Sequence, residues 1–259
     1  VDFHRAGGVP QVLKILLENG VLHGECRTIH GRTMAEMLKD VPAEPRADQQ
    51  AIRPWSKPLY AQGHLAILRG NLAPNGAVIK QAAAAQNLLQ HEGRAVVFSS
   101  LADMAARLDS PDLDVRADDI LVLQNAGPKG APGMPEAGYI PIPKKLLAAG
   151  VKDMVRISDA RMSGTAFGTI VLHISPESAV GGPLALVRTG DRIKLDTAGR
   201  RIDLLVGEKE MTKRRESLPP PPSGAGRRGY EKLWFDTVTQ AEQGCDFDFS
   251  IPKIDKSIP

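Results

Sequence analysis

The sequence is poor in cysteine. Its 259 residues include only two, Cys26 and Cys245, which lie far apart and form no Cys-x-x-Cys pair. This scarcity argues against a disulfide framework and for a reducing, cytoplasmic setting. Six histidines are present, but none stands in a His-x-His or HExxH spacing. Neither residue type therefore predicts a metal site, and we expect ordinary buried or surface side chains.

Long apolar runs and a charge imbalance are also missing. No run approaches the roughly 18 apolar residues that a membrane-spanning helix needs, and no signal peptide is visible. The formal net charge is +3, and the basic residues are scattered apart from short clusters at residues 213–215 and 227–228. These features disfavour a membrane or nucleic-acid partner. Because the chain starts with Val1 rather than Met, we expect coding sequence to precede it.

The first 60 residues combine two helix signals with a loop. Apolar side chains share one helical face over residues 10–18, with Pro10 in the first turn and Gly20 as a stop. Thr33 and Glu36 have the spacing of a capping box. Residues 41–58 hold four prolines and no periodicity, so we place a connecting loop there. A domain boundary near Tyr60 follows.

Residues 61–206 change to short apolar runs punctuated by turns, which predicts one β-rich α/β domain. Two runs flank a Gly-bearing turn at residues 197–200, as in a β-hairpin. Ser100, with Asp103 three residues later, has the position of a helix N-cap. The expected strands are residues 64–69, 94–98, 120–123, 154–157, 169–174, 191–195 and 202–206, and the expected helices are residues 77–89, 100–107 and 144–149.

Residues 207–259 form a more polar extension. A helix is expected at residues 208–216, followed by four consecutive prolines at 219–222 that favour a stiff, extended spacer. Apolar and aromatic side chains then recur at helical spacing over residues 230–241. Packing on its own domain and packing in a subunit interface both explain this face.

Two glycine-bearing loops, each after an apolar strand, are the strongest candidates for a site. The Gly/Pro-rich loop, residues 127–136, carries one carboxylate, Glu136, and the serine loop, residues 159–165, carries Ser163. Glycine lets a backbone approach a ligand closely, and loops on a rigid scaffold often carry function. No GxSxG elbow surrounds Ser163, which weakens a serine-hydrolase interpretation. Lys129 could contact an anion or stay solvated, and the residues alone leave this open.

Several long motifs run along the chain: DFHRAGGVP, GNLAPNGAVIK, GPKGAPGMPE, DARMSGTAFGT, SPESAVGGPLALVRTGDRI and GYEKLWFDTVTQAEQGCDFDF. They resemble motifs of the dihydroxy-acid and sugar-acid dehydratases, a family of iron–sulfur hydro-lyases. The resemblance covers nearly the whole chain but only the C-terminal part of such an enzyme. It implies a swivelling β/β/α domain, preceded by the end of an N-terminal α/β domain.

The resemblance also implies roles for individual residues. Ser163 matches the general base that removes the proton at C2 of the substrate, and Thr165 matches a substrate-binding position. Glu136 matches a ligand of an essential Mg²⁺. Further Mg²⁺ ligands and the cysteines of an iron–sulfur cluster, expected as 2Fe–2S, belong to the portion that this chain lacks. For Asp159 and Arg161, which precede Ser163 in the serine loop, we expect a structural role.

The implied activity is dehydration of a sugar acid to its 2-keto-3-deoxy acid, by a homodimer or homotetramer. DARMSGTAFGT and the GYEKLW…GCDFDF tail resemble the sugar-acid branch, and the dihydroxy acids of branched-chain amino-acid synthesis are the alternative substrates. A second alternative is a non-catalytic swivelling domain that acts as a binding or assembly module. Upstream coding sequence with widely spaced cysteines would favour the enzyme. The 259 residues alone are expected to be inactive.

Overall fold

A computed structural model describes residues 1–59, 63–164 and 166–250 of the chain. Its contacts divide the chain into two compact units, Val1–Gly63 and His64–Pro259. The sequence-based boundaries at residues 60 and 206 remain predictions. None of the helices in the described ranges combines the length and apolar character that a membrane crossing requires.

The first unit is a small helical segment with a thin core. Its helices are α1 (Asp2–Arg5), α2 (Gly8–Glu18) and α3 (Met34–Met37). Helix α2 buries Ile15 against Ala6 and Ile52, with Val12 packed beside them. The predicted capping box is confirmed, because Thr33 and Glu36 each accept a hydrogen bond from the other's backbone N–H. Beyond α3, the described residues of this unit contain no further helix and no strand, as the prolines predict.

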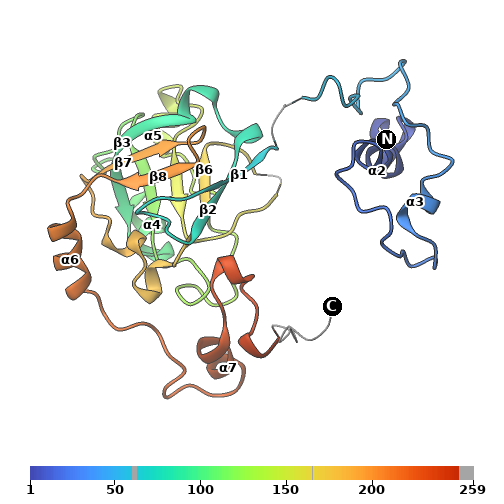
Figure 1. The fold of residues 1–259 in the computed structure, drawn as a ribbon. Coiled ribbons are helices and arrows are strands. Elements are labelled where there is room, and N and C mark those ends of the chain that lie inside the picture. Colours follow the sequence, from blue (N-terminus) through green and yellow to red (C-terminus); the bar gives the residue numbers. More distant parts are fainter. Residues whose placement is uncertain (60–62, 165, 251–259) are drawn as a thin grey trace. The chain divides into compact units, whose positions relative to one another are not determined.

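The second unit is built on one mixed sheet, in which the described residues form eight strands (Figure 1). The order across the sheet is β1-β2-β6-β5-β4-β3-β7-β8. Strands β3, β4, β5 and β6 run parallel, and the outer pairs are antiparallel. The strands are β1 (Leu65–Leu68), β2 (Gly76–Lys80), β3 (Gln90–Phe98), β4 (Ile120–Leu123), β5 (Arg156–Ser158), β6 (Ile170–Ser175), β7 (Arg192–Asp196) and β8 (Arg201–Leu204).

The sheet curls until its two edges almost meet, which produces a nearly closed barrel. At the seam, the backbone N–H of Arg69 donates to Arg200 O and the N–H of Ile202 donates to Arg69 O. Asn71 completes the closure, since its side chain exchanges two hydrogen bonds with the backbone of Leu204. This closure satisfies edge groups that an open sheet would leave unpaired. The expected β-rich α/β fold is confirmed.

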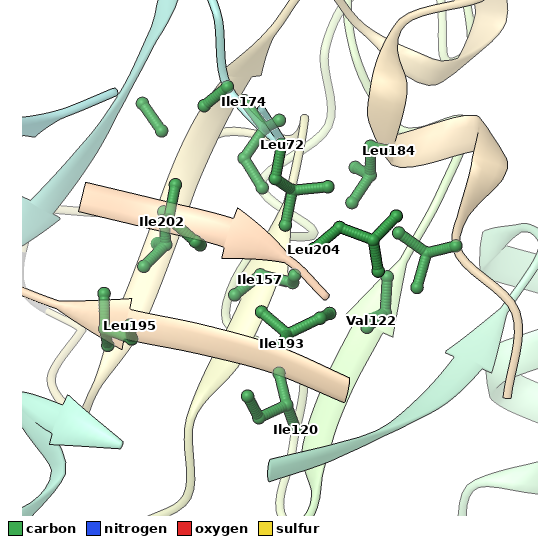
Figure 2. Packing of buried hydrophobic residues seen from close by; sticks show 14 of the residues in the cluster. Leu72, Ile120, Val122, Ile157, Ile174, Leu184, Ile193, Leu195, Ile202 and Leu204 are labelled. Carbon is green, nitrogen blue, oxygen red and sulfur yellow. The ribbon is translucent and has the colours of Figure 1, made fainter. Parts of the chain in front are cut away.

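Alternation along the strands divides the apolar core into two clusters. On β4, Ile120 and Val122 point into the barrel, while Leu121 and Leu123 belong to the outer cluster with Phe98. Successive side chains of a strand point to opposite faces, so a strand covered on both faces is apolar throughout. Figure 2 shows the inner cluster, to which the β7–β8 hairpin contributes Ile193, Leu195, Ile202 and Leu204.

The described residues of this unit also form four α-helices, two between strands and two after the last strand: α4 (Leu101–Arg107), α5 (Lys144–Ala148), α6 (Glu208–Glu216) and α7 (Gly229–Thr237). As predicted, the Ser100 hydroxyl caps α4 by accepting from Asp103 N–H. The short 3₁₀ helices are η1 (Gln81–Ala83), η2 (Gln86–Leu88), η3 (Ser178–Val180), η4 (Pro183–Leu186), η5 (Ala241–Gln243) and η6 (Asp248–Ser250).

The prediction of a helix at residues 77–89 is wrong. This stretch forms strand β2 and the 3₁₀ turns η1 and η2. Its alanines favour a helix in isolation, but Val78 and Ile79 pair with β1 on one side and β6 on the other. Burial of Ile79 in the barrel outweighs the local preference.

Candidate functional site

Both candidate loops leave the sheet at the carboxyl end of a parallel strand. The Gly/Pro-rich loop follows β4, the serine loop follows β5, and β4 pairs with β5 in parallel. The two loops therefore start side by side at one edge. In open α/β sheets, ligands bind outside the carboxyl ends of parallel strands, and the same geometry converges here.

A buried carboxylate, Asp159, forms hydrogen bonds to the backbone where the loops leave the sheet. It is 1% exposed and accepts hydrogen bonds from the backbone N–H groups of Ala126 (3.0 Å) and Ser178 (2.7 Å). Burial raises the pKa of Asp159, and these hydrogen bonds oppose the rise. Its carboxylate fixes the starts of three segments, so Asp159 orients the backbone of the site.

A second buried carboxylate, Glu177, holds the Gly/Pro-rich loop from the other side. It is 1% exposed and accepts from the backbone N–H groups of Lys129 and Gly130 and from Gln240 Nε2. Burial raises the pKa of Glu177. A Cβ on Gly127 would lie 2.7 Å from its carboxylate, so only glycine fits there. The sequence did not single out Glu177, because one acid between two glycine-rich stretches has no distinctive spacing.

The C-terminal segment supports the same loop. Trp234 of α7 donates its indole N–H to Pro128 O at 2.8 Å, and its ring packs edge-on against Phe247. Gln240 reaches Glu177 as described above. The aromatic face of this helix therefore packs on its own unit. A subunit interface remains a prediction for Tyr230, which is 66% exposed.

Arg161 connects the serine loop with Glu136. Its guanidinium lies 3.0 Å from a Glu136 carboxylate oxygen and also donates to Met134 O. The Arg161 carbonyl accepts from Gly138 N–H at 2.8 Å. A Cβ on Gly138 would lie 2.2 Å from Leu172, so this approach requires glycine. Glu136 and Arg161 are about half exposed, at 48% and 45%, so the carboxylate can reach a ligand.

The serine loop is fixed where it rejoins the sheet. Gly168 N–H donates to Ala83 O at 2.8 Å, and Asp153 accepts from both the backbone and the hydroxyl of Thr169. Ser163 lies between these anchors and Arg161 and is half-buried. Thr165, the expected substrate contact, lies outside the described residues. The structure thus brings the segments of Glu136 and Ser163 together through Arg161.

Arg156 of β5 is a buried cation whose loss should lower the stability of the second unit. Its side chain is 2% exposed, pairs with Asp153 at 2.9 Å and donates to the carbonyls of Tyr139 and Ile140. Arg156→Met should lower the free energy of unfolding by about 3–5 kcal/mol, because it removes the charged partner of the little-exposed Asp153 and the donor to two carbonyls. Urea denaturation of the chain measures this loss.

The matched control is Arg192→Met. Arg192 pairs with Glu92 at 3.0 Å, but both side chains are about half exposed, at 50% and 45%. Exposed ion pairs contribute about 0–1 kcal/mol, so this variant should unfold nearly as the parent does. Equal small losses for the two variants would contradict the role assigned to Arg156.

A pocket of about 440 Å³ opens beside β1, β2 and β6 and reaches the serine loop through His173. His173 N–H donates to Ala160 O, and burial together with the charge of Arg161 lowers the pKa of its imidazole. Cys245 lines the same pocket, where burial and the nearby Glu177 and Glu242 raise the pKa of its thiol. Cys245 is therefore a neutral thiol at neutral pH.

The residues of this chain suit Mg²⁺ better than an iron–sulfur cluster. Glu136 offers an accessible carboxylate, the oxygen ligand that Mg²⁺ prefers. Within the described part of the chain, no group of three His, Cys, Asp or Glu side chains is placed to hold a metal. Iron–sulfur clusters are held by several thiolates, whereas the sequence contains two cysteines, one in each unit. Glu136 fits as one Mg²⁺ ligand, and the thiols do not fit a cluster.

Comparison with known families gives two matches in chain order. The family model described as "Dihydroxy-acid/6-phosphogluconate dehydratase N-terminal" matches residues 1–37. The model of the C-terminal domain of the same family matches residues 50–245. The second match contains both candidate loops.

Individual relatives bear several dehydratase names. L-arabonate dehydratase of Azospirillum brasilense is 46% identical over 264 residues, which cover 100% of this chain and 45% of that protein. For 6-deoxy-6-sulfo-D-gluconate dehydratase of Pseudomonas putida, 47% identity covers 96% of the chain and 42% of the relative. For dihydroxy-acid dehydratase of Synechococcus sp. (strain JA-3-3Ab), the figures are 47%, 96% and 43%. The chain spans less than half the length of these relatives.

Proposed function

Because the chain belongs to the dihydroxy-acid/6-phosphogluconate dehydratase family, we propose that it supplies a general base and a metal ligand to a hydro-lyase acting on sugar acids. One observation carries this proposal. Arg161 ties the Glu136 carboxylate to the loop that bears Ser163, with an N–O distance of 3.0 Å. Arg161 also donates to Met134 O, and its carbonyl accepts from Gly138 N–H. A candidate metal ligand and a candidate base thus project from two loops that side-chain and backbone hydrogen bonds join.

Ser163 would take the proton from C2 of the substrate, and the C3–O bond would break with departure of the hydroxyl. The resulting enol tautomerises to the 2-keto-3-deoxy acid, so the net loss is one water. Glu136 would hold Mg²⁺, which supplies positive charge for the substrate's carboxylate and C2 hydroxyl. No residue of this chain is assigned to the leaving hydroxyl, and no step is routed through an iron–sulfur cluster. Such a cluster would be bound outside this chain.

The substrate class is part of the proposal. Identity does not separate the branches, since the sugar-acid and dihydroxy-acid relatives are 46% and 47% identical to the chain. Sugar acids are favoured by the resemblance of DARMSGTAFGT and the C-terminal tail to that branch. A cytoplasmic homo-oligomer, expected from the sequence, completes the proposal.

The direct test is a substrate screen on the full-length protein, meaning this chain with any further coding sequence to which it belongs. The purified protein, with Mg²⁺ supplied and its cofactors intact, is incubated with pentonates, hexonates and 2,3-dihydroxy acids. Formation of a 2-keto acid from a sugar acid is the expected result. Turnover confined to dihydroxy acids would overturn the substrate class. No turnover on any acid would favour the non-catalytic module.

Glu136→Gln tests the metal ligand. The amide keeps the size of the side chain but removes a formal charge from the Mg²⁺ ligands. We expect the Mg²⁺ concentration for half-maximal activity to rise by about 10-fold or more, since even outer-shell changes cost that much, and high Mg²⁺ to restore part of the rate. Titration of activity with Mg²⁺ measures this shift. Glu92→Gln, an exposed acid of β3, is the control, and an unchanged Mg²⁺ dependence in Glu136→Gln would remove Glu136 from the ligands.

A further inference from the structure

A lysine from a neighbouring strand contacts the serine loop. Lys80, the last residue of β2, donates from Nζ to Gly164 O at 2.7 Å. Gly164 directly follows Ser163 in the chain. A second hydrogen bond joins the same parts of the chain, because Ala83 O, in the turn after β2, accepts from Gly168 N–H. The Lys80 ammonium is therefore fixed beside the peptide that follows the candidate base.

The charge of Lys80 is not neutralised within the described parts of the chain. No carboxylate there lies within ion-pair distance of Nζ, although the side chain is half-buried. By contrast, the little-exposed arginines Arg94, Arg156 and Arg214 each pair with an aspartate. A half-buried ammonium that donates to a carbonyl loses part of its hydration and is not neutralised. Its positive charge can therefore act on neighbouring groups.

The other charged groups near the serine loop are held in ion pairs or by backbone N–H groups. Arg161 forms an ion pair with Glu136. His173 is neutral at neutral pH because burial and the charge of Arg161 lower the pKa of its ring. Asp153 and Arg156, at the root of the loop, pair with each other. His64 precedes the strand partner of Lys80 in β1 and is exposed. Asp159, in the serine loop itself, is held by the backbone N–H groups of Ala126 and Ser178. Among these described residues, Lys80 is therefore the cation without a carboxylate partner.

We propose that Lys80 is a positioning residue that holds Ser163 in place through Gly164 and stabilises its anionic form electrostatically. The inference rests on the proposed function, since it assumes that Ser163 is the base. An ordinary hydroxyl is too weakly acidic to serve as a base near neutral pH, so its alkoxide requires a nearby positive charge. An opposite charge within about 4–6 Å shifts a pKa by about 1–3 units. Lys80 brings such a charge to the residue that directly follows Ser163, through its bond to Gly164 O.

The test compares three variants of the full-length protein over a range of pH. Lys80→Arg keeps the charge and a donor, Lys80→Gln keeps a donor without the charge, and Lys80→Met removes both. Lys194→Met, an exposed lysine of β7, is the matched control. We measure kcat and KM for the sugar acid as a function of pH, with circular dichroism to verify folding.

We expect kcat at neutral pH to fall about 10–100-fold in Lys80→Gln and Lys80→Met, with KM within about 3-fold, because the charge acts on the base and not on the substrate. The rising limb of the kcat profile should move about 1–2 pH units higher, since less alkoxide exists at a given pH. Lys80→Arg and Lys194→Met should keep the parent profile. A loss of rate that is equal at every pH, or one that Lys80→Arg does not restore, would reduce Lys80 to a structural clamp and overturn the proposal.

A double variant separates this inference from the function on which it rests. If Lys80 acts through Ser163, then Lys80→Met should lower the residual rate of Ser163→Ala by less than about 2-fold. A further drop of the same size as in the parent would show that Lys80 acts independently, which contradicts the proposal. Near-normal activity of Ser163→Ala alone would instead overturn the assignment of the base, whatever the Lys80 variants do.

Discussion

Ser163→Ala in the full-length protein should lower turnover by about 10²–10⁴-fold while the fold and metal content stay unchanged. This range is typical for the loss of a general base, and Ser163 is proposed as the only base. The structure limits the damage to the backbone, because Gly164 O keeps its bond to Lys80 and Gly168 N–H keeps its bond to Ala83. The change is therefore confined to one hydroxyl.

The measurement is kcat and KM for the sugar acid identified in the screen, with Mg²⁺ and iron contents determined in parallel. Ser217→Ala is the control, since its hydroxyl donates to Arg214 O at the end of α6, away from both candidate loops in the chain. It should retain the parent rate. If Ser163→Ala turns over at a rate close to that of the parent, another group removes the C2 proton and the proposed mechanism is wrong.

The second large effect concerns the 259 residues by themselves. This chain should fold in its second unit, yet purify colourless, without iron or sulfide, and show no dehydration of any sugar acid. One proposed Mg²⁺ ligand, a proposed base and the expected substrate contact at Thr165 are only part of such a site. Catalysis of this kind depends on positioning and on metal charge, each of which contributes several kcal/mol. The sheet and its two apolar clusters are complete without the first unit.

Absorption spectra, metal analysis and a 2-keto-acid assay on the purified chain check this expectation, with the full-length protein as the active reference. Thermal unfolding of the chain should still show one cooperative transition for the second unit. A bound cluster, or measurable turnover in its absence, would show that the site is more complete than the described residues indicate.

Short apolar runs bounded by turns predicted most of the strands, because a strand packed on both faces requires apolar residues at nearly every position. Ile120 to Leu123 are all buried, and the strand has the predicted bounds. The stretch at 77–89 failed for the complementary reason. Its alanines carry a weak helical preference, and pairing with β1 and β6 overrides it. Local preference decides only where tertiary pairing does not compete.

By itself, the sequence determined the fold class, the family resemblance and the two loops that carry Glu136 and Ser163, because each depends on residue type and short-range order. Only the tertiary structure decided what joins the loops. Arg161 bonds Glu136 from 25 residues further along the chain, Glu177 reaches Lys129 from 48, and Lys80 reaches Gly164 from 84. Contacts of this kind leave no periodic trace in a sequence, since they arise when strands distant in the chain become neighbours in the sheet.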